Sequence, residues 1–256
     1  MKILAIGDIT SPGGVKHLCD KLWAIRRKFG IDLCIVNGEN ASFITGITTD
    51  AAEVLLRSGA DVITGGNHSL QNPASHALLD SVAEVLRPVN FPDEMSGHGY
   101  TIVDTGMERV LVISAMGCVN ITPALPAPYS YIEGVLEKCR GEYDLAVLDI
   151  HAEATGEKLA VAHSFDGRIS VIFGTHTHVA TADATVLPLG TGYVTDLGMC
   201  GESGGIMGIE VQSVLRKLRD GAPGRFVCAA GKPVADGVIF TLYGTYRCTE
   251  IKRIKF

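Results

Sequence analysis

Seven side chains of the kinds that bind metal ions recur along the sequence, most of them beside a glycine or just after an apolar run. They are Asp8, Glu39, Asn40, Asn67, His151, His176 and His178. Carboxylate oxygen, amide oxygen and imidazole nitrogen together suit hard or borderline divalent cations. One carboxylate shared by two cations can hold them about 3.5–4 Å apart, an arrangement that activates water beside a phosphoryl group. These residue types predict a two-metal hydrolytic site.

Each residue also has an ordinary alternative interpretation. Asp8 could cap a helix, and the two asparagines suit the left-handed positions of glycine-rich turns. His151 alone could equally be a buried packing residue. The spacing of His176 and His178 is more informative, because the imidazoles of a His-x-His turn can bind neighbouring metals. The shared position of all seven, where apolar strands end, favours metal binding.

The elements that must position these residues alternate between strand and helix. Strands are predicted at Lys2–Gly7, Leu33–Asn37, Asp61–Thr64, Leu145–Ile150 and Val171–Phe173, and helices at Val15–Phe29 and Asp50–Ser58. In layered α/β folds, ligands bind at the carboxyl ends of the strands. We therefore expect the seven side chains to meet at one edge of one sheet.

The rest of the chain has a more hairpin-like pattern. We predict paired strands near Gly99–Asp104 and Val110–Ala115, helices at Tyr131–Arg140 and Ile206–Arg219, and strands near Arg225–Ala229, Gly237–Tyr243 and Tyr246–Ile254. Alternating elements followed by hairpins indicate an α/β fold with mixed sheets. The absence of a convincing linker predicts one domain over residues 1–256.

Composition narrows the function. A net charge of −6 argues against binding to bulk nucleic acid or an anionic membrane, but a bound metal could still attract one small nucleotide. No apolar run reaches the roughly 18 residues of a membrane span, and the first apolar stretch is too short for a signal peptide. The seven scattered cysteines contain no C-x-x-C pair, so we expect a reducing, cytoplasmic compartment. The sequence leaves a monomer and a homo-oligomer open.

Five short motifs, taken in order, resemble a known family. They are G-D-I at 7–9, N-G-E-N at 37–40, G-N-H at 66–68, D-x-H-A-E at 149–153 and G-T-H-T-H-V at 174–179. The set resembles the calcineurin-like metallophosphoesterases and, within them, the bacterial YmdB-type phosphodiesterases. The likeness continues through Thr181–Asp183, Thr195–Met199 and Gly208–Glu210, and so covers nearly the whole chain.

The resemblance implies a four-layer α/β/β/α sandwich and hydrolysis of phosphodiester bonds, including those of 2′,3′- or 3′,5′-cyclic nucleotides. It implies two metal ions, iron or manganese, with zinc also compatible. One metal would be bound by Asp8, Asn40 and His178, and the other by Asn67, His151 and His176. Glu39 would bridge them, and a metal-activated hydroxide would attack phosphorus while His68 acts as general acid.

Three departures from the family pattern affect the expected substrate more than the metals. Thr10 stands where broader metallophosphoesterases carry the histidine of D-x-H, and Asn40 is its YmdB-type replacement. The segments Ser42–Thr45 and Ser69–Asn72 also differ, and we expect them to flank the substrate pocket. A phosphomonoesterase or nucleotidase, or a non-catalytic metal-containing nucleotide-binding regulator, therefore stays open beside the phosphodiesterase.

Overall fold

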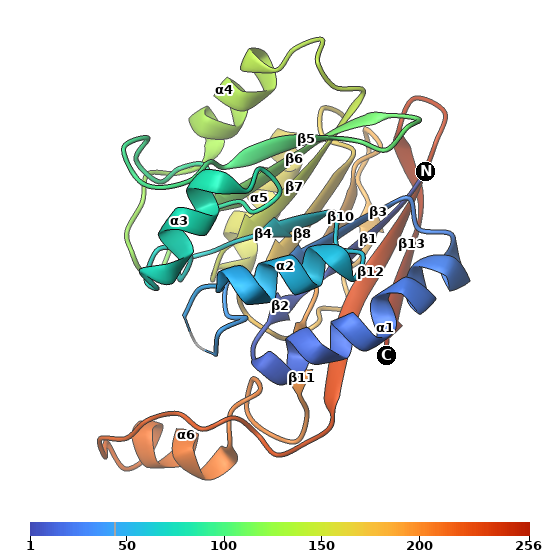
Figure 1. The fold of residues 1–256 in the computed structure, drawn as a ribbon. Helices are drawn as coiled ribbons and strands as arrows, with labels where there is room; N and C mark the ends of the chain where they lie inside the picture. Colours follow the sequence, from blue (N-terminus) through green and yellow to red (C-terminus); the bar gives the residue numbers. More distant parts are fainter. Residues whose placement is uncertain (44) are drawn as a thin grey trace.

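A computed structural model describes residues 1–43 and 45–256. Two mixed β-sheets face one another, and helices cover their outer faces (Figure 1). The first sheet runs β2-β11-β12-β1-β3-β4, with β13 also paired to β12, and the second runs β5-β6-β7-β8-β10-β9.

The first sheet contains β1 (Lys2–Ile6), β2 (Asp8–Ile9), β3 (Leu33–Asn37), β4 (Val62–Thr64), β11 (Met199–Glu202), β12 (Pro233–Tyr243) and β13 (Arg247–Lys255). The second contains β5 (Tyr100–Asp104), β6 (Arg109–Met116), β7 (Leu145–His151), β8 (Val171–Thr175), β9 (Thr185–Val186) and β10 (Gly192–Val194). The helices are α1 (Pro12–Phe29), α2 (Thr49–Arg57), α3 (Ala74–Ser81), α4 (Tyr129–Lys138), α5 (Thr155–Ser164) and α6 (Val211–Leu218).

Strand β1 shows how the layers form. Its side chains alternate, so Leu4 and Ile6 pack against helices α1 to α3, whereas Ile3 and Ala5 face the second sheet. A third apolar cluster joins the outer face of the second sheet to α4 and α5. The order is therefore helices, sheet, sheet, helices, which confirms the predicted four-layer sandwich.

Helix α1 illustrates the local signals that set these elements. The Ser11 hydroxyl accepts a hydrogen bond from the Gly14 N–H, and Pro12 occupies the first turn. The helix ends at Phe29 and is capped by Gly30, whose φ of 65° is left-handed and accessible to glycine without steric cost. Leu18 and Leu22 form its buried face.

Parallel pairing brings the strand ends together. Strands β1, β3 and β4 are mutually parallel neighbours in the first sheet, as are β6, β7 and β8 in the second. The expectation of one edge of one sheet was wrong, because the candidate residues come from both sheets. The site lies where the carboxyl ends of the two sheets face each other.

Several predicted elements also need correction. The helix expected from Ile206 begins only at Val211, because a turn with left-handed Met207 and Gly208 pairs Ile206 with Ile209. The strand expected over Arg225–Ala229 is reduced to a single bridge from Cys228 to Ile209. Helices α3 and α5 were not predicted, and the single domain stays a prediction. In the described part of the chain, no helix is both long and apolar enough to cross a bilayer.

Candidate metal centre

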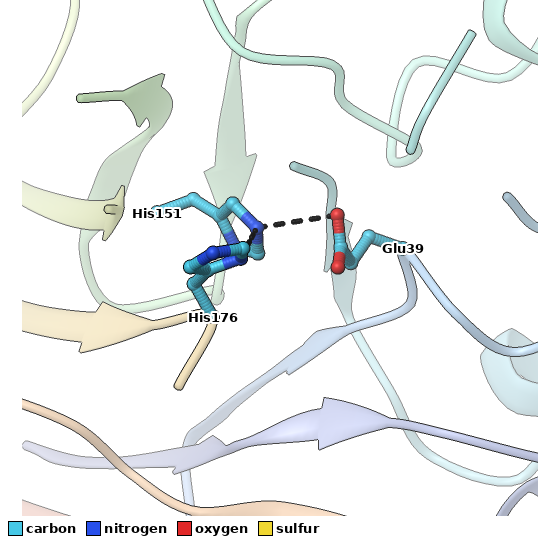
Figure 2. A group of neighbouring side chains, drawn as sticks. All are labelled: Glu39, His151 and His176. Atoms are coloured by element: carbon cyan, nitrogen blue, oxygen red, sulfur yellow. Dashed lines mark hydrogen bonds and ion pairs between the residues drawn. The ribbon is translucent and has the colours of Figure 1, made fainter. Parts of the chain in front are cut away.

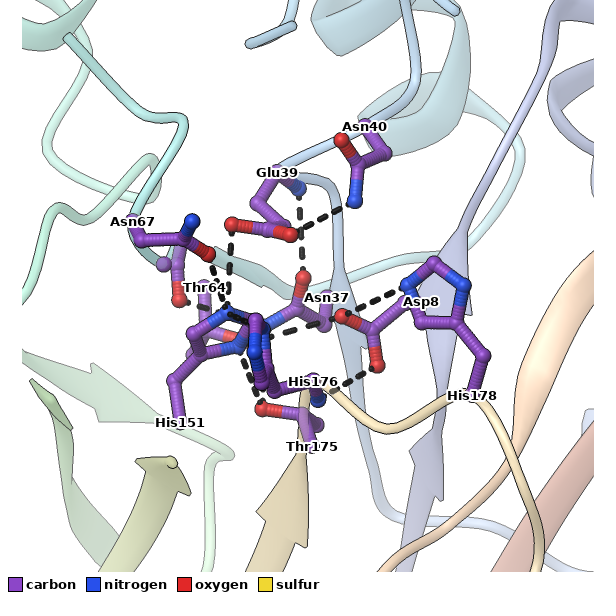
Figure 3. A network of polar contacts seen from close by, with 12 residues as sticks. Asp8, Asn37, Glu39, Asn40, Thr64, Asn67, His151, Thr175, His176 and His178 are labelled. Carbon is purple, nitrogen blue, oxygen red and sulfur yellow. Dashed lines mark hydrogen bonds and ion pairs between the residues drawn. The ribbon is translucent and has the colours of Figure 1, made fainter. Parts of the chain in front are cut away.

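The seven predicted ligands lie together at the carboxyl ends of strands from both sheets (Figure 3). Asp8 lies in β2, Glu39 and Asn40 follow β3, Asn67 follows β4, His151 ends β7, and His176 and His178 follow β8. Asp8, Glu39, Asn40, Asn67 and His151 are buried, and His176 and His178 are partly exposed. The metal-binding roles of all seven stay predictions, but the proximity on which those roles depend is present.

One group of donor atoms gathers around Nε2 of His151 (Figure 2). This nitrogen lies 3.0 Å from Oδ1 of Asn67, 3.1 Å from Nδ1 of His176 and 3.2 Å from Oε2 of Glu39. Ligand atoms placed about 2.1 Å from one cation lie roughly 3.0–3.4 Å from each other. The donor spacing therefore fits a single small cation.

Gly66 leaves room for this group. A Cβ atom on Gly66 would lie 2.3 Å from both Oε2 of Glu39 and Nε2 of His151. Because such a contact is far inside van der Waals distance, any larger residue would fill the space where the donors converge. This explains on steric grounds why the G-N-H motif has glycine at position 66.

A second group of donors consists of Asp8, Glu39 and His178, which offer atoms within 4.8 Å of one another. Oδ1 of Asp8 lies 3.7 Å from Nε2 of His178. This oxygen is buried and has no hydrogen-bond partner among the described residues, a costly state for a carboxylate unless a cation compensates it. The orphaned oxygen therefore also fits a metal ion.

Asn40 lies at the edge of the second group. Its Nδ2 donates a hydrogen bond to Oε1 of Glu39 at 2.6 Å, so the side chain reaches the shared carboxylate. A half-turn of the amide would present its oxygen in the same place. Glu39 belongs to both groups, which is the position expected of a bridging ligand.

The pKa values of the two buried carboxyl groups, Asp8 and Glu39, shift in opposite directions. Burial raises the pKa of Asp8 well above its ordinary value, and the nearby negative charge of Glu39 raises it further. Burial alone would raise the pKa of Glu39 too, but His151 and His68 together outweigh burial and lower it to about 2. Two closely placed buried carboxyl groups thus favour a neighbouring positive charge.

The pKa values of the three histidines also shift in opposite directions. Burial would lower the pKa of His151, but Glu39, Asp8 and Asp149 raise it to about 9. Burial and the charge of His151 lower the pKa of His176 to about 3, and burial likewise lowers the pKa of His178. His176 and His178 are therefore neutral imidazoles at pH 7, the form that binds metal.

The His-x-His turn has an unusual backbone. His176 and His178 adopt φ values of 96° and 60°, a region that non-glycine residues rarely enter. Asp8 Oδ2 accepts a hydrogen bond from the His176 N–H, and Asp196 Oδ2 accepts two from Thr177. Such strain persists only where surrounding contacts enforce it, as these do.

Asp196 is in turn paired with a buried lysine. The Lys158 Nζ lies 2.8 Å from Oδ2 of Asp196 and donates to the Thr175 carbonyl oxygen at 2.7 Å. Both side chains are fully buried. Sequence reasoning missed this pair, because helix α5, which carries Lys158, was itself not predicted.

His68, the predicted general acid, lies beside the donors and is partly exposed. Its backbone N–H donates to Oε2 of Glu39 at 3.1 Å, and its Nδ1 lies 2.7 Å from Oε1 of Gln71. The location is compatible with proton transfer to a bound substrate, and the role stays a prediction. Gln71 belongs to one of the two segments that depart from the family pattern.

The two departing segments are neighbours in the structure. Gly46, just after Ser42–Thr45, packs against the Asn72 side chain, and a Cβ on Gly46 would lie 2.9 Å from that of Asn72. Phe43 hydrogen-bonds through its N–H to the Asn40 carbonyl oxygen. Ile44 lies outside the described residues. Both segments therefore adjoin predicted site residues, and their place beside a substrate pocket stays a prediction.

Comparison with known proteins identifies the family. The family described as YmdB-like protein matches residues 4–254. A 2′,3′-cyclic-nucleotide 2′-phosphodiesterase of Bacillus subtilis (strain 168) is 36% identical over 255 residues, covering 99% of this chain and 96% of its own.

Solved structures agree. A hypothetical protein from Thermus thermophilus superposes with a TM-score of 0.93 at 37% identity, covering 100% of this chain and 99% of its own. A phosphatase from Mycoplasma pneumoniae gives 0.92 at 28% identity, with 100% and 93% covered. A 5′-nucleotidase precursor from Thermus thermophilus shares the fold alone, with a TM-score of 0.58 at 15% identity over 100% of this chain and 54% of its own. The predicted family is confirmed, and the chain belongs to the YmdB-like proteins.

Proposed function

We propose that this protein is a metal-dependent phosphodiesterase that binds two metal ions and hydrolyses cyclic nucleotides. The observation that carries the proposal is that Glu39 belongs to both groups of converging donors, one with His151 and His176, the other with Asp8 and His178. A carboxylate in that position is what a two-metal phosphoesterase requires.

The general class of enzyme follows from the relatives of this chain. Membership of the family and the full-length relatives make the chain a hydrolytic phosphoesterase. The name of the Bacillus subtilis relative makes 2′,3′-cyclic nucleotides the first substrates to test, with 3′,5′-cyclic nucleotides second. Because both families of compound carry one negative charge on phosphorus, locally bound cations would attract them despite the net charge of −6.

The donor set restricts the metals. It offers carboxylate, amide and imidazole groups and no thiolate among the residues that converge, which suits iron or manganese and is also compatible with zinc. When bound, two such cations supply activated water and neutralise charge on the phosphate oxygens. Asp8, Asn40 and His178 would bind one, and Asn67, His151 and His176 the other, with Glu39 between them.

The chain itself supplies the acid. The backbone N–H of His68 donates to Glu39, which holds this residue beside the donor groups. Oε1 of Gln71 accepts from Nδ1, so the protonated ring would hold its second proton on Nε2, which lies 3.4 Å from Nδ2 of Asn67, and would pass it to the departing oxygen. The partial exposure of His68 allows the ring to regain a proton from solvent after each turnover.

The proposal for the cellular location follows from the thiols. All seven cysteines are free, and Cys34, Cys139, Cys200 and Cys248 are buried. Unpaired thiols are stable in a reducing environment, which supports the cytoplasm as the compartment.

A substrate panel tests the proposal. Purified protein loaded with Mn²⁺ or Fe²⁺ should hydrolyse 2′,3′- or 3′,5′-cyclic nucleotides faster than phosphomonoesters, and a chelator should abolish the reaction. Faster hydrolysis of nucleoside monophosphates would identify a phosphomonoesterase instead. Metal binding and nucleotide binding without turnover on any ester would identify a regulator and overturn the catalytic proposal.

A further inference from the structure

Two histidines in the first donor group present different ring nitrogens to the same point. His151 directs Nε2 and His176 directs Nδ1, and these atoms lie 3.1 Å apart (Figure 2). A neutral imidazole has one nitrogen with a proton and one with a free lone pair. For both lone pairs to face one cation, the two rings must hold opposite tautomers.

The ring of His151 is held by a buried chain of hydrogen bonds. Its Nδ1 lies 2.9 Å from Oγ1 of Thr175, beneath the imidazole in Figure 3. Oγ1 of Thr175 donates to Oδ1 of Asp149 at 2.7 Å. Because a hydroxyl has one proton and it goes to Asp149, Thr175 can only accept from His151, which places the imidazole proton on Nδ1.

Asp149 is suited to fix the direction of that chain. Its Oδ2 already accepts hydrogen bonds from Thr64 at 2.5 Å and from Nδ2 of Asn37 at 3.0 Å. With both of its oxygens occupied by donors and no exposure to solvent, the side chain accepts throughout. The chain of bonds therefore runs in one sense, from His151 to Thr175 to Asp149.

The ring of His176 has a different support. Its Nε2 lies 3.2 Å from Oε2 of Glu153, which is half exposed. A carboxylate beside Nε2 favours the proton on that nitrogen, leaving Nδ1 free to face His151, Asn67 and Glu39.

We propose that Asp149, acting through Thr175, and Glu153, acting directly, are positioning residues that impose opposite tautomers on His151 and His176. The inference rests on the proposed metal site and explains why D-x-H-A-E contains two acidic residues around one ligand. Neither carboxylate need touch a cation. Each sets which nitrogen of its histidine is available.

Zinc is the probe for the test because it is diamagnetic. In the zinc-loaded protein, NMR of the imidazole nitrogens should show a slowly exchanging proton on Nδ1 of His151 and a proton on Nε2 of His176. Competition with a chelating dye then measures zinc affinity. Removal of such supporting contacts typically lowers metal affinity 10–100-fold.

Thr175→Val keeps the shape of the residue and removes the hydroxyl. We expect it to weaken zinc binding at one position 10–100-fold and to release the slowly exchanging His151 proton, and Thr175→Ser should restore both. Thr191→Val is the matched control, since Thr191 is an equally buried threonine whose hydroxyl bonds only the backbone of Gly167 and Ile169. Equal loss of affinity in both valine variants would assign the effect to packing and overturn the proposal.

Glu153 gives a second variant with little risk to folding, because its side chain is half exposed. Glu153→Ala should weaken zinc binding about tenfold or more, whereas Glu153→Gln, whose carbonyl can still accept from Nε2, should recover much of it. Unchanged affinity in Glu153→Ala and in Thr175→Val would overturn the tautomer proposal while the metal site stands. A wild-type protein that takes up no zinc, iron or manganese would overturn both the site and this inference.

Discussion

His68 Nδ1 lies 2.7 Å from the side-chain oxygen of Gln71, at a position where the family pattern changes. Gln71 also donates through Nε2 to the Asn67 carbonyl oxygen at 3.4 Å, so one amide spans the predicted acid and a predicted ligand. The departure at Ser69–Asn72 therefore places a neutral group against the ring of His68.

His68→Ala should lower kcat about 10²–10⁴-fold with metal content unchanged, because general-acid assistance is typically of that size. Gln71→Ala should lower kcat less, about tenfold, by loosening the orientation of the ring. Steady-state kinetics with metal analysis checks both. Gln212→Ala is the control, since Gln212 is an exposed amide in helix α6, away from the donors. Full activity in His68→Ala would remove His68 from the mechanism.

Glu39→Ala should empty at least one metal position, because this carboxylate belongs to both donor groups. Elemental analysis should find at most one equivalent of metal, against two in the wild-type protein. Glu133→Ala, which removes an exposed carboxylate paired with Arg168, should keep both equivalents. Two full equivalents in Glu39→Ala would contradict the bridging position.

Gly66→Ala should abolish binding of one metal, because its Cβ would stand 2.3 Å from Glu39 and His151 donor atoms. Isothermal titration of the metal-free variant should show the lost site. Gly134→Ala is a matched control, since nothing lies within 4 Å of its Cβ position and it lies in helix α4. That change should leave metal binding intact and stabilise the helix by about 0.5–1 kcal/mol. Normal titration of Gly66→Ala would disprove the steric account.

Metal affinity should rise with pH up to about 9. In the metal-free protein the surrounding carboxylates raise the pKa of His151 to about 9, so this ring carries an extra proton at pH 7. A metal ion binds the neutral ring and must displace that proton, so affinity should increase about tenfold per pH unit below 9 and level off above it. Calorimetry in buffers of different ionisation enthalpy measures the released proton. Equal affinities at pH 6.5 and 8.5 would contradict it.

Lys158→Met should destabilise the fold by about 3–5 kcal/mol, because it leaves the fully buried carboxylate of Asp196 without its countercharge. The double variant Lys158→Met with Asp196→Asn should recover part of that loss, since it removes both charges. Urea unfolding gives the free energies. A double variant less stable than Lys158→Met would contradict this prediction. It would show that the hydrogen bonds from Thr177 to Asp196 stabilise the fold by more than the unpaired buried charge destabilises it.

The local elements were largely readable because their signals are local. Strand β3 occupies the predicted Leu33–Asn37, and helix α1 begins three residues before the predicted Val15 because Ser11 and Pro12 extend the cap. The helix predicted from Ile206 failed for the opposite reason. The apolar residues after Ile206 have helical spacing, which is why a helix was predicted there. The glycines at 204, 205 and 208 favour a turn instead, so the helix begins only at Val211.

The sequence by itself determined which donors are present, which strand ends deliver them and which family the chain resembles, because residue type and periodicity are properties of short segments. Only the tertiary structure decided that the donors come from two facing sheets, that Glu39 reaches both groups, and that Asp149 contacts His151 through Thr175. Those relationships join residues more than twenty positions apart. They depend on how the sheets stack and on strand register, which no local pattern specifies.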